Sequence, residues 1–432
     1  MPTKGAGGLL SVADALSGVL SPLKPLAAET IPTTQSIGRV LAETAVSGLD
    51  MPAADLSSMD GYAVRAADCL TAGTRLTRIG ESAAGHPFSG NIGPGETIRI
   101  FTGAYLPAGA DAIILQEDAI ATAESDGATI TITEPATAGR FIRPVGLDAK
   151  KGAPLLPAGT RITARAMALL LAAGQIDIAV RRKPVIGILS TGDELVPPGL
   201  PLAPGQITSS NAAYLMAFVA ASGGTPVDLG IAKDRPGAAL YAVRNTPQPL
   251  DFILTTGGAS VGTHDHIATD LNTTDLNTKN PKNSGAKESG TILGFWKIAM
   301  RPGKPLISGA IDGIPLLGLP GNPVSSAICA LVFLRPVIAT MTGDITTATA
   351  TDALIPAELA HDLPANDKRQ DYLRAIITYR PGAIPLVTPA AKQDSSMIGV
   401  LATATALLVR LPFDPARKTG DTVSIMLYPD TL

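Results

Sequence analysis

The chain has 432 residues, of which 45% are hydrophobic and 16% charged, and its net charge is −3. This length exceeds a single hydrophobic core, so several domains are expected, and the weakly acidic balance argues against a broad nucleic-acid-binding surface. The two cysteines, Cys69 and Cys329, exclude a disulfide scaffold and a zinc cluster and are typical of a reducing cytosol. The N-terminal stretch lacks the order of a signal peptide, and the longest apolar helix that we expect, near 166–174, is too short to span a bilayer. The sequence therefore predicts a cytoplasmic protein with no membrane partner.

The predicted secondary structure changes twice in the first part of the chain. Apolar residues at helical spacing predict a helix over 9–21, and 36–55 suggests a short helix followed by an extended piece. From 61 to 140, short apolar runs separated by glycine and proline predict a β domain.

Beyond this β domain a hairpin-like element is expected over 152–163, followed by a helix over 164–174 that ends at Gly174. We expect 141–181 to pack back on the N-terminal helix, so that the β domain is an insertion.

From residue 184 onward, strands and helices alternate, which predicts a parallel sheet with helices on both faces. Short strand-like segments follow again after residue 350 and predict a small β-barrel or sandwich. The polar segment 271–290 is interpreted as a surface insertion without a functional role. The predicted division is an elongated domain (1–50 and 141–181), an inserted β domain (51–140), an α/β domain (182–345) and a C-terminal barrel (346–432).

Three strands of the α/β domain end in loops rich in glycine and hydroxyl groups: "STGDEL" (190–195), "TTGGASVGTHD" (255–265) and "GLPGNPVSS" (318–326). Ligands bind at the carboxyl ends of parallel strands, and the helix start after the third loop is a good seat for phosphate. Such loops also carry glycine for geometry alone, but three together favour a ligand site. None matches a P-loop or a dinucleotide fingerprint. The candidate ligand-binding residues are Ser190, Thr191, Gly192, Gly257, Gly258, Ser260, Gly262, Pro320, Gly321, Asn322 and Ser325.

Charged residues gather in the same kind of loop. Lys297, Arg301 and Lys304 form either a solvated basic turn or an anion clamp. The acids Asp60, Glu194 and Asp265 lie in glycine-rich loops, where the plain alternatives are a turn or a helix cap. Carboxylates beside a phosphate site become functional when Mg²⁺ bridges them.

Six motifs, in this order and at suitable spacing, resemble the molybdopterin molybdenumtransferase family, to which the C-terminal domain of gephyrin also belongs: "MDGYAV", "RIFTGAYLPAGADAIILQED", "STGDEL", "TTGGASVGTHD", "MRPGKP" and "GLPGNPVSS". The resemblance covers nearly the whole chain. It implies an α/β multidomain protein: a parallel molybdopterin-binding domain, an inserted β-rich domain, an elongated domain and a C-terminal barrel. It further implies a homodimer whose cleft lies between the α/β domain of one subunit and the β domain of the other.

The resemblance also implies the chemistry: Mg²⁺-dependent insertion of molybdenum from molybdate into adenylylated molybdopterin, with release of AMP. Asp60, Glu194 and Asp265 would be catalytic, and the same three with Asp234 would hold the metal. Thr102 and the cations Lys297, Arg301 and Lys304 would bind substrate, as would Arg374 and Ser395 of the C-terminal domain. Arg301 stands where lysine is frequent in the family. Protein partners would be a molybdopterin adenylyltransferase and molybdoenzyme chaperones.

Two other functions compete with this reading. A scaffold could bind molybdopterin without turnover, but intact acids and cations in every site loop argue against lost catalysis. Adenylylation of molybdopterin is the other alternative; a domain like 182–335 suffices for it, which leaves the domain with "MDGYAV" unexplained.

Overall fold

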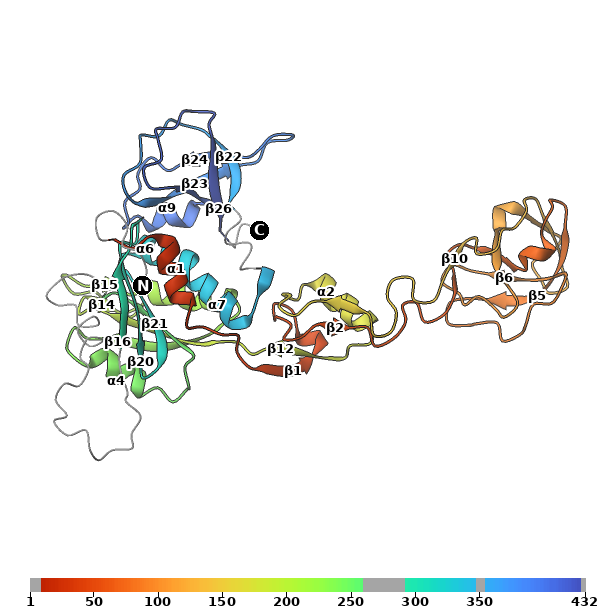
Figure 1. The fold of residues 1–432 in the computed structure, drawn as a ribbon, viewed down its shortest axis with the longest axis horizontal. Coiled ribbons are helices and arrows are strands. Elements are labelled where there is room, and N and C mark those ends of the chain that lie inside the picture. The colour runs from red at the N-terminus through yellow and green to blue at the C-terminus, as the bar shows by residue number, and fades with distance from the viewer. Residues whose placement is uncertain (1–8, 259–291, 347–353, 429–432) are drawn as a thin grey trace.

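The computed structural model describes residues 9–258, 292–346 and 354–428. The molecule is elongated (Figure 1). A β domain lies at one end, a narrow middle part follows, and the α/β domain and the C-terminal barrel lie together at the other end. The predicted multidomain α/β architecture is thus confirmed.

The middle part is built by strands that are distant in sequence. Strand β1 (Ala28–Pro32) pairs antiparallel with β12 (Asp177–Arg181), and β2 (Ala45–Val46) pairs with β11 (Pro154–Leu156). The predicted helix over 164–174 is confirmed as α2 (Ala164–Ala172), with Gly174 beyond its end at a φ of +79°.

Two predictions for the middle part are wrong for one physical reason. No helix forms within 36–44, because backbone groups there bond to distant strands: the Gly38 N–H donates to the Ile162 carbonyl (2.9 Å) and the Ala42 N–H to the Ala179 carbonyl (3.0 Å). The 152–163 segment likewise forms no local hairpin, because its strand β11 pairs with β2. Long-range pairing overrides local propensity at both places.

The N-terminal helix is confirmed as α1 (Val12–Leu20), capped by the Ser11 hydroxyl, but its expected packing is wrong. Its buried face, Val12, Ala15 and Val19, belongs to the core of the α/β domain and not to the middle part. The Leu10 N–H also donates to the Lys297 carbonyl at 3.1 Å. The first described residues therefore lie on the α/β domain, and the chain stays in contact with it up to Leu26, whose N–H donates to the Met341 carbonyl at 2.8 Å.

The inserted β domain is a six-stranded sheet in the order β7-β4-β6-β5-β9-β8, as its sequence texture predicts. Strand β5 alternates buried with more exposed residues, whereas β4 is buried throughout, with Tyr62 and Val64 in one apolar core and Ala63 in another. A short pair, β3 (Leu56–Ser57) with β10 (Ile142–Arg143), connects the sheet to the middle part. The strands are β4 (Gly61–Val64), β5 (Arg75–Ser82), β6 (Glu96–Ile100), β7 (Ala112–Leu115), β8 (Ala119–Ala121) and β9 (Thr129–Ile132).

The α/β sheet has the order β16-β13-β17-β21-β20-β18. The first four strands are parallel, as predicted, whereas β20 runs opposite to its neighbours β21 and β18, so the sheet is mixed. The segment with the three cations extends from the end of the edge strand β18 to the residue before β20. The strands are β13 (Val185–Thr191), β16 (Thr225–Ala232), β17 (Phe252–Thr256), β18 (Ile292–Lys297), β20 (Pro305–Ile311) and β21 (Ile314–Leu319), and a small parallel pair, β14 (Leu195–Val196) with β15 (Ile207–Thr208), lies beside them.

Helices cover both faces of this sheet, as predicted. In β17, Phe252 and Leu254 pack in the core that contains α1, whereas Ile253 packs on the opposite face. The first face also carries α3 (Ser210–Ala221), α6 (Pro323–Cys329) and α7 (Arg335–Thr342), and the other face carries α4 (Ala238–Arg244).

The longest apolar helix is not the predicted one near 166–174 but the continuous segment Pro323–Thr342, in which α6 and α7 are joined by a π-helical turn, Ala330–Leu334. Its mean hydropathy is 1.9, and 89% of it is buried inside the protein. This burial identifies it as the core helix of the α/β domain.

The C-terminal part is a closed five-stranded barrel, which confirms the predicted barrel. The strands follow the order β23-β24-β22-β26-β25, and β25 pairs again with β23. A strand of the α/β domain, β19 (Met300–Arg301), adds to β23 and ties the two domains together. The barrel consists of β22 (Ile355–Leu359), β23 (Gln370–Thr378), β24 (Leu386–Pro389), β25 (Ala406–Arg410) and β26 (Thr422–Leu427), with helix α9 (Ile398–Thr403) beside it.

Gly61, which follows Asp60, fits only as glycine because β7 passes directly over it. A Cβ at this position would lie 1.9 Å from the Ile114 carbonyl oxygen. Gly61→Ala should therefore separate β4 from β7 and destabilise the β domain by about 2 kcal/mol or more, as overpacking does elsewhere. Hydrogen exchange of the β4 and β7 amides measures this loss. Gly399→Ala, at a helical glycine with open space around it, is the matched control and should leave these amides unchanged; equal protection in both variants would contradict the prediction.

Candidate active site

The three glycine-rich loops converge, as the sequence predicts, on a cavity of about 770 Å³ at the carboxyl ends of β13, β17 and β21. Two helices, α3 and α6, begin at its wall. Its lining residues are Ser190, Thr191, Gly192, Glu194, Leu195, Ile207, Thr208, Ser209, Ser210, Asn211, Asp234, Thr256, Gly257, Gly258, Pro305, Pro320, Gly321, Asn322, Pro323, Ser396 and Ile398.

The end of β13 supplies a hydroxyl and an acid. Thr191 is 7% exposed, and its Oγ1 makes no hydrogen bond within the described part of the chain. Gly192 follows at a φ of +145°, and a Cβ there would lie 2.5 Å from a carboxylate oxygen of Glu194. The missing side chain therefore lets Glu194 fold back over the strand end at the cavity.

Gly257, at the end of β17, sits against the end of β13. It has a φ of +90°, and a Cβ would lie 2.4 Å from the Thr191 carbonyl oxygen. The Asn211 amide, near the start of α3, donates to Thr256 Oγ1 (2.9 Å) and to the Gly321 carbonyl (2.7 Å). The Asn211 side chain thus connects the start of α3 with the end of β17 and with the loop after β21.

The third loop ends at the start of α6. Asn322 is the N-cap residue but makes no side-chain capping bond, and Pro323 opens the helix. The first N–H groups of a helix lack intrahelical partners and carry partial positive charge. Since α3 also begins at the cavity, the wall offers two helix N-termini to an anionic ligand. Ser325, a predicted ligand residue, is 4% exposed in the first turn of α6 and does not line the cavity.

Two acids, Glu194 and Asp234, line the same cavity. Asp234 bonds reciprocally with Asp193: the Asp193 N–H donates to Asp234 Oδ2 (3.3 Å) and the Asp234 N–H to Asp193 Oδ1 (3.4 Å). Within the described ranges no three Asp, Glu, His or Cys side chains come together as a metal cluster. Two carboxylates nonetheless suit Mg²⁺, which takes one or two protein carboxylates and completes its shell with water and substrate phosphates.

The three predicted cations have different surroundings. Lys304 is exposed beside Pro305, a lining residue, and Lys297 is exposed at the end of β18. Arg301 instead bonds to the barrel residues Asp367, Asn366 and Asp371. The hydrogen bond to Asp371 raises the pKa of Arg301. Arg301 therefore ties the barrel to the α/β domain in this structure, a different task from the predicted anion clamp.

The two barrel residues of the prediction also differ from each other. Ser395 contacts the site, because its Oγ accepts a hydrogen bond from the Asn322 amide at 3.1 Å. Arg374 is 1% exposed and does not line the cavity. Its guanidinium is bonded inside the barrel, to Gln393 Oε1 and the Asp394 carbonyl.

Asp60 and Thr102 form a separate group on the inserted β domain. The Thr102 N–H and hydroxyl both donate to Asp60 Oδ1, at 2.7 and 2.8 Å. These two bonds, the backbone one first, lower the pKa of Asp60 and keep its exposed carboxylate ionised. Strand β6, which Thr102 follows, lies at the far end of the molecule from β14 and β15 beside the cavity (Figure 1). A single chain therefore does not bring Asp60 to Glu194.

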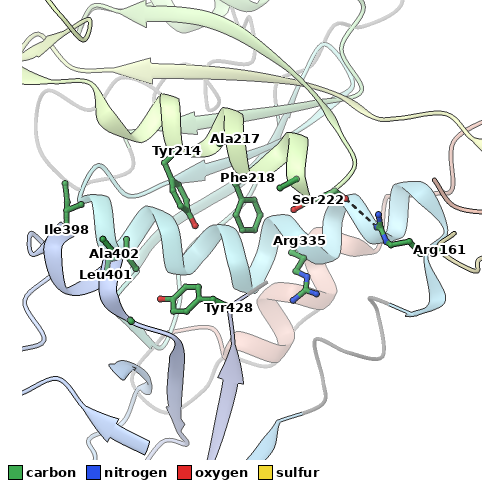
Figure 2. A pocket seen from close by; sticks show the side chains of 12 residues that line it. Arg161, Tyr214, Ala217, Phe218, Ser222, Arg335, Ile398, Leu401, Ala402 and Tyr428 are labelled. Carbon is green, nitrogen blue, oxygen red and sulfur yellow. Dashed lines mark hydrogen bonds between the residues drawn. The ribbon is translucent and has the colours of Figure 1, made fainter. Parts of the chain in front are cut away.

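A second cavity, of about 660 Å³, runs along α3 away from the first (Figure 2). Tyr214 and Phe218 of α3 line it, with ring centroids 5.9 Å apart, and Ile398 borders both cavities. Arg161 and Arg335 lie at its other end, where burial and the neighbouring Arg161 lower the pKa of Arg335.

Some predictions lie outside the described residues: Ser260, Gly262 and Asp265, and the segment 271–290. Conversely, the sequence reasoning missed cavity residues that follow or precede the recognised motifs. Asn211 and Ser209 precede the apolar face of α3, and Ser396 and Ile398 come from the barrel. The first two carry a recognisable signal, a polar cluster before a helix after the "STGDEL" strand. The barrel residues carry none, because only tertiary packing brings them to the cavity.

Known proteins share this combination of parts. Three family models match in order: the MoeA N-terminal region (domains I and II) over 10–174, a probable molybdopterin-binding domain over 187–340, and the MoeA C-terminal region (domain IV) over 356–428. Two crystal structures of the molybdopterin biosynthesis protein MoeA from Pyrococcus horikoshii superpose with TM-scores of 0.77 and 0.79. They are 30% and 26% identical and cover 97% of this chain and 99% and 100% of theirs. The fold and cavity thus define a molybdopterin-binding protein of the MoeA class.

The sequence relatives are more specific. The molybdopterin molybdenumtransferase of Bacillus subtilis is 32% identical over 403 residues, which are 92% of this chain and 89% of that protein. The Nostoc enzyme of the same name is 32% identical over 400 residues, 91% of this chain and 87% of that protein. The chain belongs to the molybdopterin molybdenumtransferase family of enzymes, as the sequence motifs indicate.

The pKa of Asp60 should depend on both bonds from Thr102. Thr102→Val removes the hydroxyl but keeps the backbone N–H, which is the larger cause of the lowered pKa. We therefore expect the pKa of Asp60 to rise but to stay below that of a free aspartate, which a ¹³C NMR titration of its carboxyl carbon measures. Thr74→Val, in the same domain but bonded to the Thr71 carbonyl, should not move it. An unchanged Asp60 titration in Thr102→Val would contradict this assignment.

Proposed function

We propose that this chain inserts molybdenum from molybdate into adenylylated molybdopterin, with Mg²⁺-dependent release of AMP. The observation that carries the proposal is the convergence of three strand ends, two helix N-termini and two carboxylates on one cavity. A molybdopterin phosphate would be bound by backbone N–H donors. Gly192, Gly257 and Gly321 line this cavity, and their missing side chains let the strand ends and Glu194 pack closely around it.

The acids and the cations have separate proposed roles, in binding Mg²⁺ and in attracting molybdate. Glu194 and Asp234 would hold Mg²⁺ beside the phosphoanhydride, with Asp265 as a third proposed ligand. The bound ion supplies charge neutralisation and Lewis-acid polarisation of a phosphoryl oxygen. Lys297 and Lys304 would attract molybdate, a dianion, at the mouth of the cavity. Water would cleave the phosphoanhydride to give AMP and the molybdopterin phosphate. Molybdate would exchange one oxygen, which leaves as water with the two dithiol protons, for the two dithiolene sulfurs.

We propose that the complete site needs a second copy of the chain. Asp60 is ionised and exposed, yet it lies on the domain farthest from the cavity. In a twofold dimer of elongated subunits, the β domain of one copy can reach the cavity of the other. The second cavity, which is lined by Tyr214 and Phe218 of α3, is an apolar surface that a partner copy could cover.

The remaining parts of the proposal rest on the family. The domain division 1–50 with 141–181, 51–140, 182–345 and 346–432 is kept, apart from helix α1, which packs on the α/β domain. A cytoplasmic location and contacts with a molybdopterin adenylyltransferase and molybdoenzyme chaperones are proposed on the same ground.

The reaction is tested by AMP release from adenylylated molybdopterin with purified protein and Mg²⁺, with and without molybdate. We expect release that depends on molybdate and falls at least about a hundredfold in Glu194→Gln, since metal-held charge contributes several kcal/mol to such steps. Tight substrate binding without release by the wild-type chain would favour a scaffold. Transfer of AMP from ATP to free molybdopterin would favour the adenylyltransferase instead.

The shared site is tested by mixing two inactive variants, Asp60→Asn and Glu194→Gln, after reversible dissociation. Half of the dimers in a random equal mixture are mixed, and each mixed dimer has one intact site. Activity should therefore return to about a quarter of the wild-type value, by the symmetry of a twofold interface. A mixture as inactive as its components would show that Asp60 and Glu194 act from the same chain or that Asp60 has no part in the site.

A further inference from the structure

We propose that Gln393 is a positioning residue of the active site. Together with Arg374 it holds the barrel segment 390–396 against the N-cap and first turn of α6. It thereby fixes one wall of the substrate cavity. The proposal rests on the function proposed above and gives the barrel domain a task within it.

Gln393 uses both the oxygen and the nitrogen of its side-chain amide to bond Arg374 and Ala390 of its own domain. Its Oε1 accepts from the Arg374 N–H (3.0 Å) and from Arg374 Nε (3.1 Å). Its Nε2 donates to the carbonyls of Arg374 (3.0 Å) and Ala390 (2.9 Å). Four hydrogen bonds from one half-buried side chain fix the start of the segment on strand β23.

Arg374 secures the next residue of the segment. Its Nη1 donates to the Asp394 carbonyl at 2.8 Å. Within the described chain no carboxylate forms a salt bridge with it, although other arginines of this region, Arg301, Arg380 and Arg410, each have at least one. Arg374 is 1% exposed, and a buried guanidinium needs hydrogen-bond acceptors; Gln393 Oε1 and the Asp394 carbonyl each accept one of its bonds.

The held segment then reaches the site. Asp394 Oδ1 accepts from the Ser396 N–H (2.8 Å) and so closes a tight turn. The Ser395 carbonyl accepts from the Val324 N–H (3.3 Å), and its hydroxyl accepts from the Asn322 amide (3.1 Å). These contacts attach the segment to the first turn of α6 through the Val324 N–H and the Asn322 side chain, directly beside the lining residues Asn322, Pro323 and Ser396.

The connection is therefore continuous from β23 through Gln393 to the cavity wall, and neither Gln393 nor Arg374 lines the cavity itself. Removing Gln393 frees the segment without touching the acids or the glycine-rich loops. A wall that contacts the bound substrate alike before and during reaction affects binding more than turnover. Loss of Gln393 should raise KM for adenylylated molybdopterin and leave kcat nearly unchanged.

The test compares Gln393→Leu, which keeps the shape but loses all four hydrogen bonds, with Gln175→Leu as control. Gln175 is also half-buried and donates one hydrogen bond, to the Val46 carbonyl in the middle part of the molecule. We expect Gln393→Leu to raise KM, and Kd measured by equilibrium dialysis, about tenfold, with kcat within about twofold and faster hydrogen exchange confined to 390–398. Gln393→Glu keeps the acceptor toward Arg374 and should recover part of the affinity. Gln175→Leu should change none of these values.

Wild-type KM and Kd in Gln393→Leu would overturn the proposal, as would a loss of kcat at unchanged KM or an equal change in Gln175→Leu. If Gln393→Leu does not fold, Gln393→Glu carries the same comparison. A wild-type chain that binds adenylylated molybdopterin but releases no AMP refutes the proposed reaction; the dialysis comparison then still decides the role of Gln393. A wild-type chain that does not bind the compound overturns both.

Discussion

The site depends on one close backbone approach, where the end of β17 meets the end of β13. At Gly257 a Cβ would lie 2.4 Å from the Thr191 carbonyl oxygen, so only glycine allows the two strand ends to stay together. Gly321 of the third loop lies against the same residue, with its Cβ position 3.5 Å from the Gly257 Cα. This approach brings the hydroxyl of Thr191, the acid Glu194 and the starts of α3 and α6 around one cavity. These glycines therefore allow the close packing of the strand ends that form the cavity floor.

The elongated shape follows from how the chain is threaded. The chain starts on the α/β domain with α1, passes through the middle part, forms the β domain and returns by the same route. The β1–β12 and β2–β11 pairs hold the outgoing and returning segments together. This arrangement places Asp60, whose carboxylate accepts two hydrogen bonds from Thr102, far from the cavity of its own chain. In the dimer proposed above, the cavity of a second copy would give that carboxylate a function.

The barrel is attached to the α/β domain at two points on strand β23. Near one end, β19 pairs with it and Arg301 bonds to Asp371, whose side chain is almost fully buried. Further along, Arg374 and Gln393 hold the segment that touches Asn322 and Val324. Breaking either attachment leaves buried polar groups without partners, which costs about 1–3 kcal/mol each. The barrel thus contributes to the site by fixing it, although most of its residues never reach the cavity.

The sequence by itself determined the class of fold, the helices α1 and α2, the strands of the β domain and the three loops of the cavity. It could do so because hydrophobic periodicity and glycine at strand ends are local signals. The tertiary structure determined the features for which the sequence carries no local signal. Residues 36–44 form no helix because their backbone bonds to segments more than a hundred residues away, and α1 joins the α/β core although the following strand β1 belongs to the middle part. Arg301 and Arg374 look alike as cations in the sequence, but Asp371 and Gln393 engage them in the folded chain. Asp371 reaches Arg301 only because the barrel packs on the α/β domain, and Gln393 reaches Arg374 only through the fold of the barrel itself.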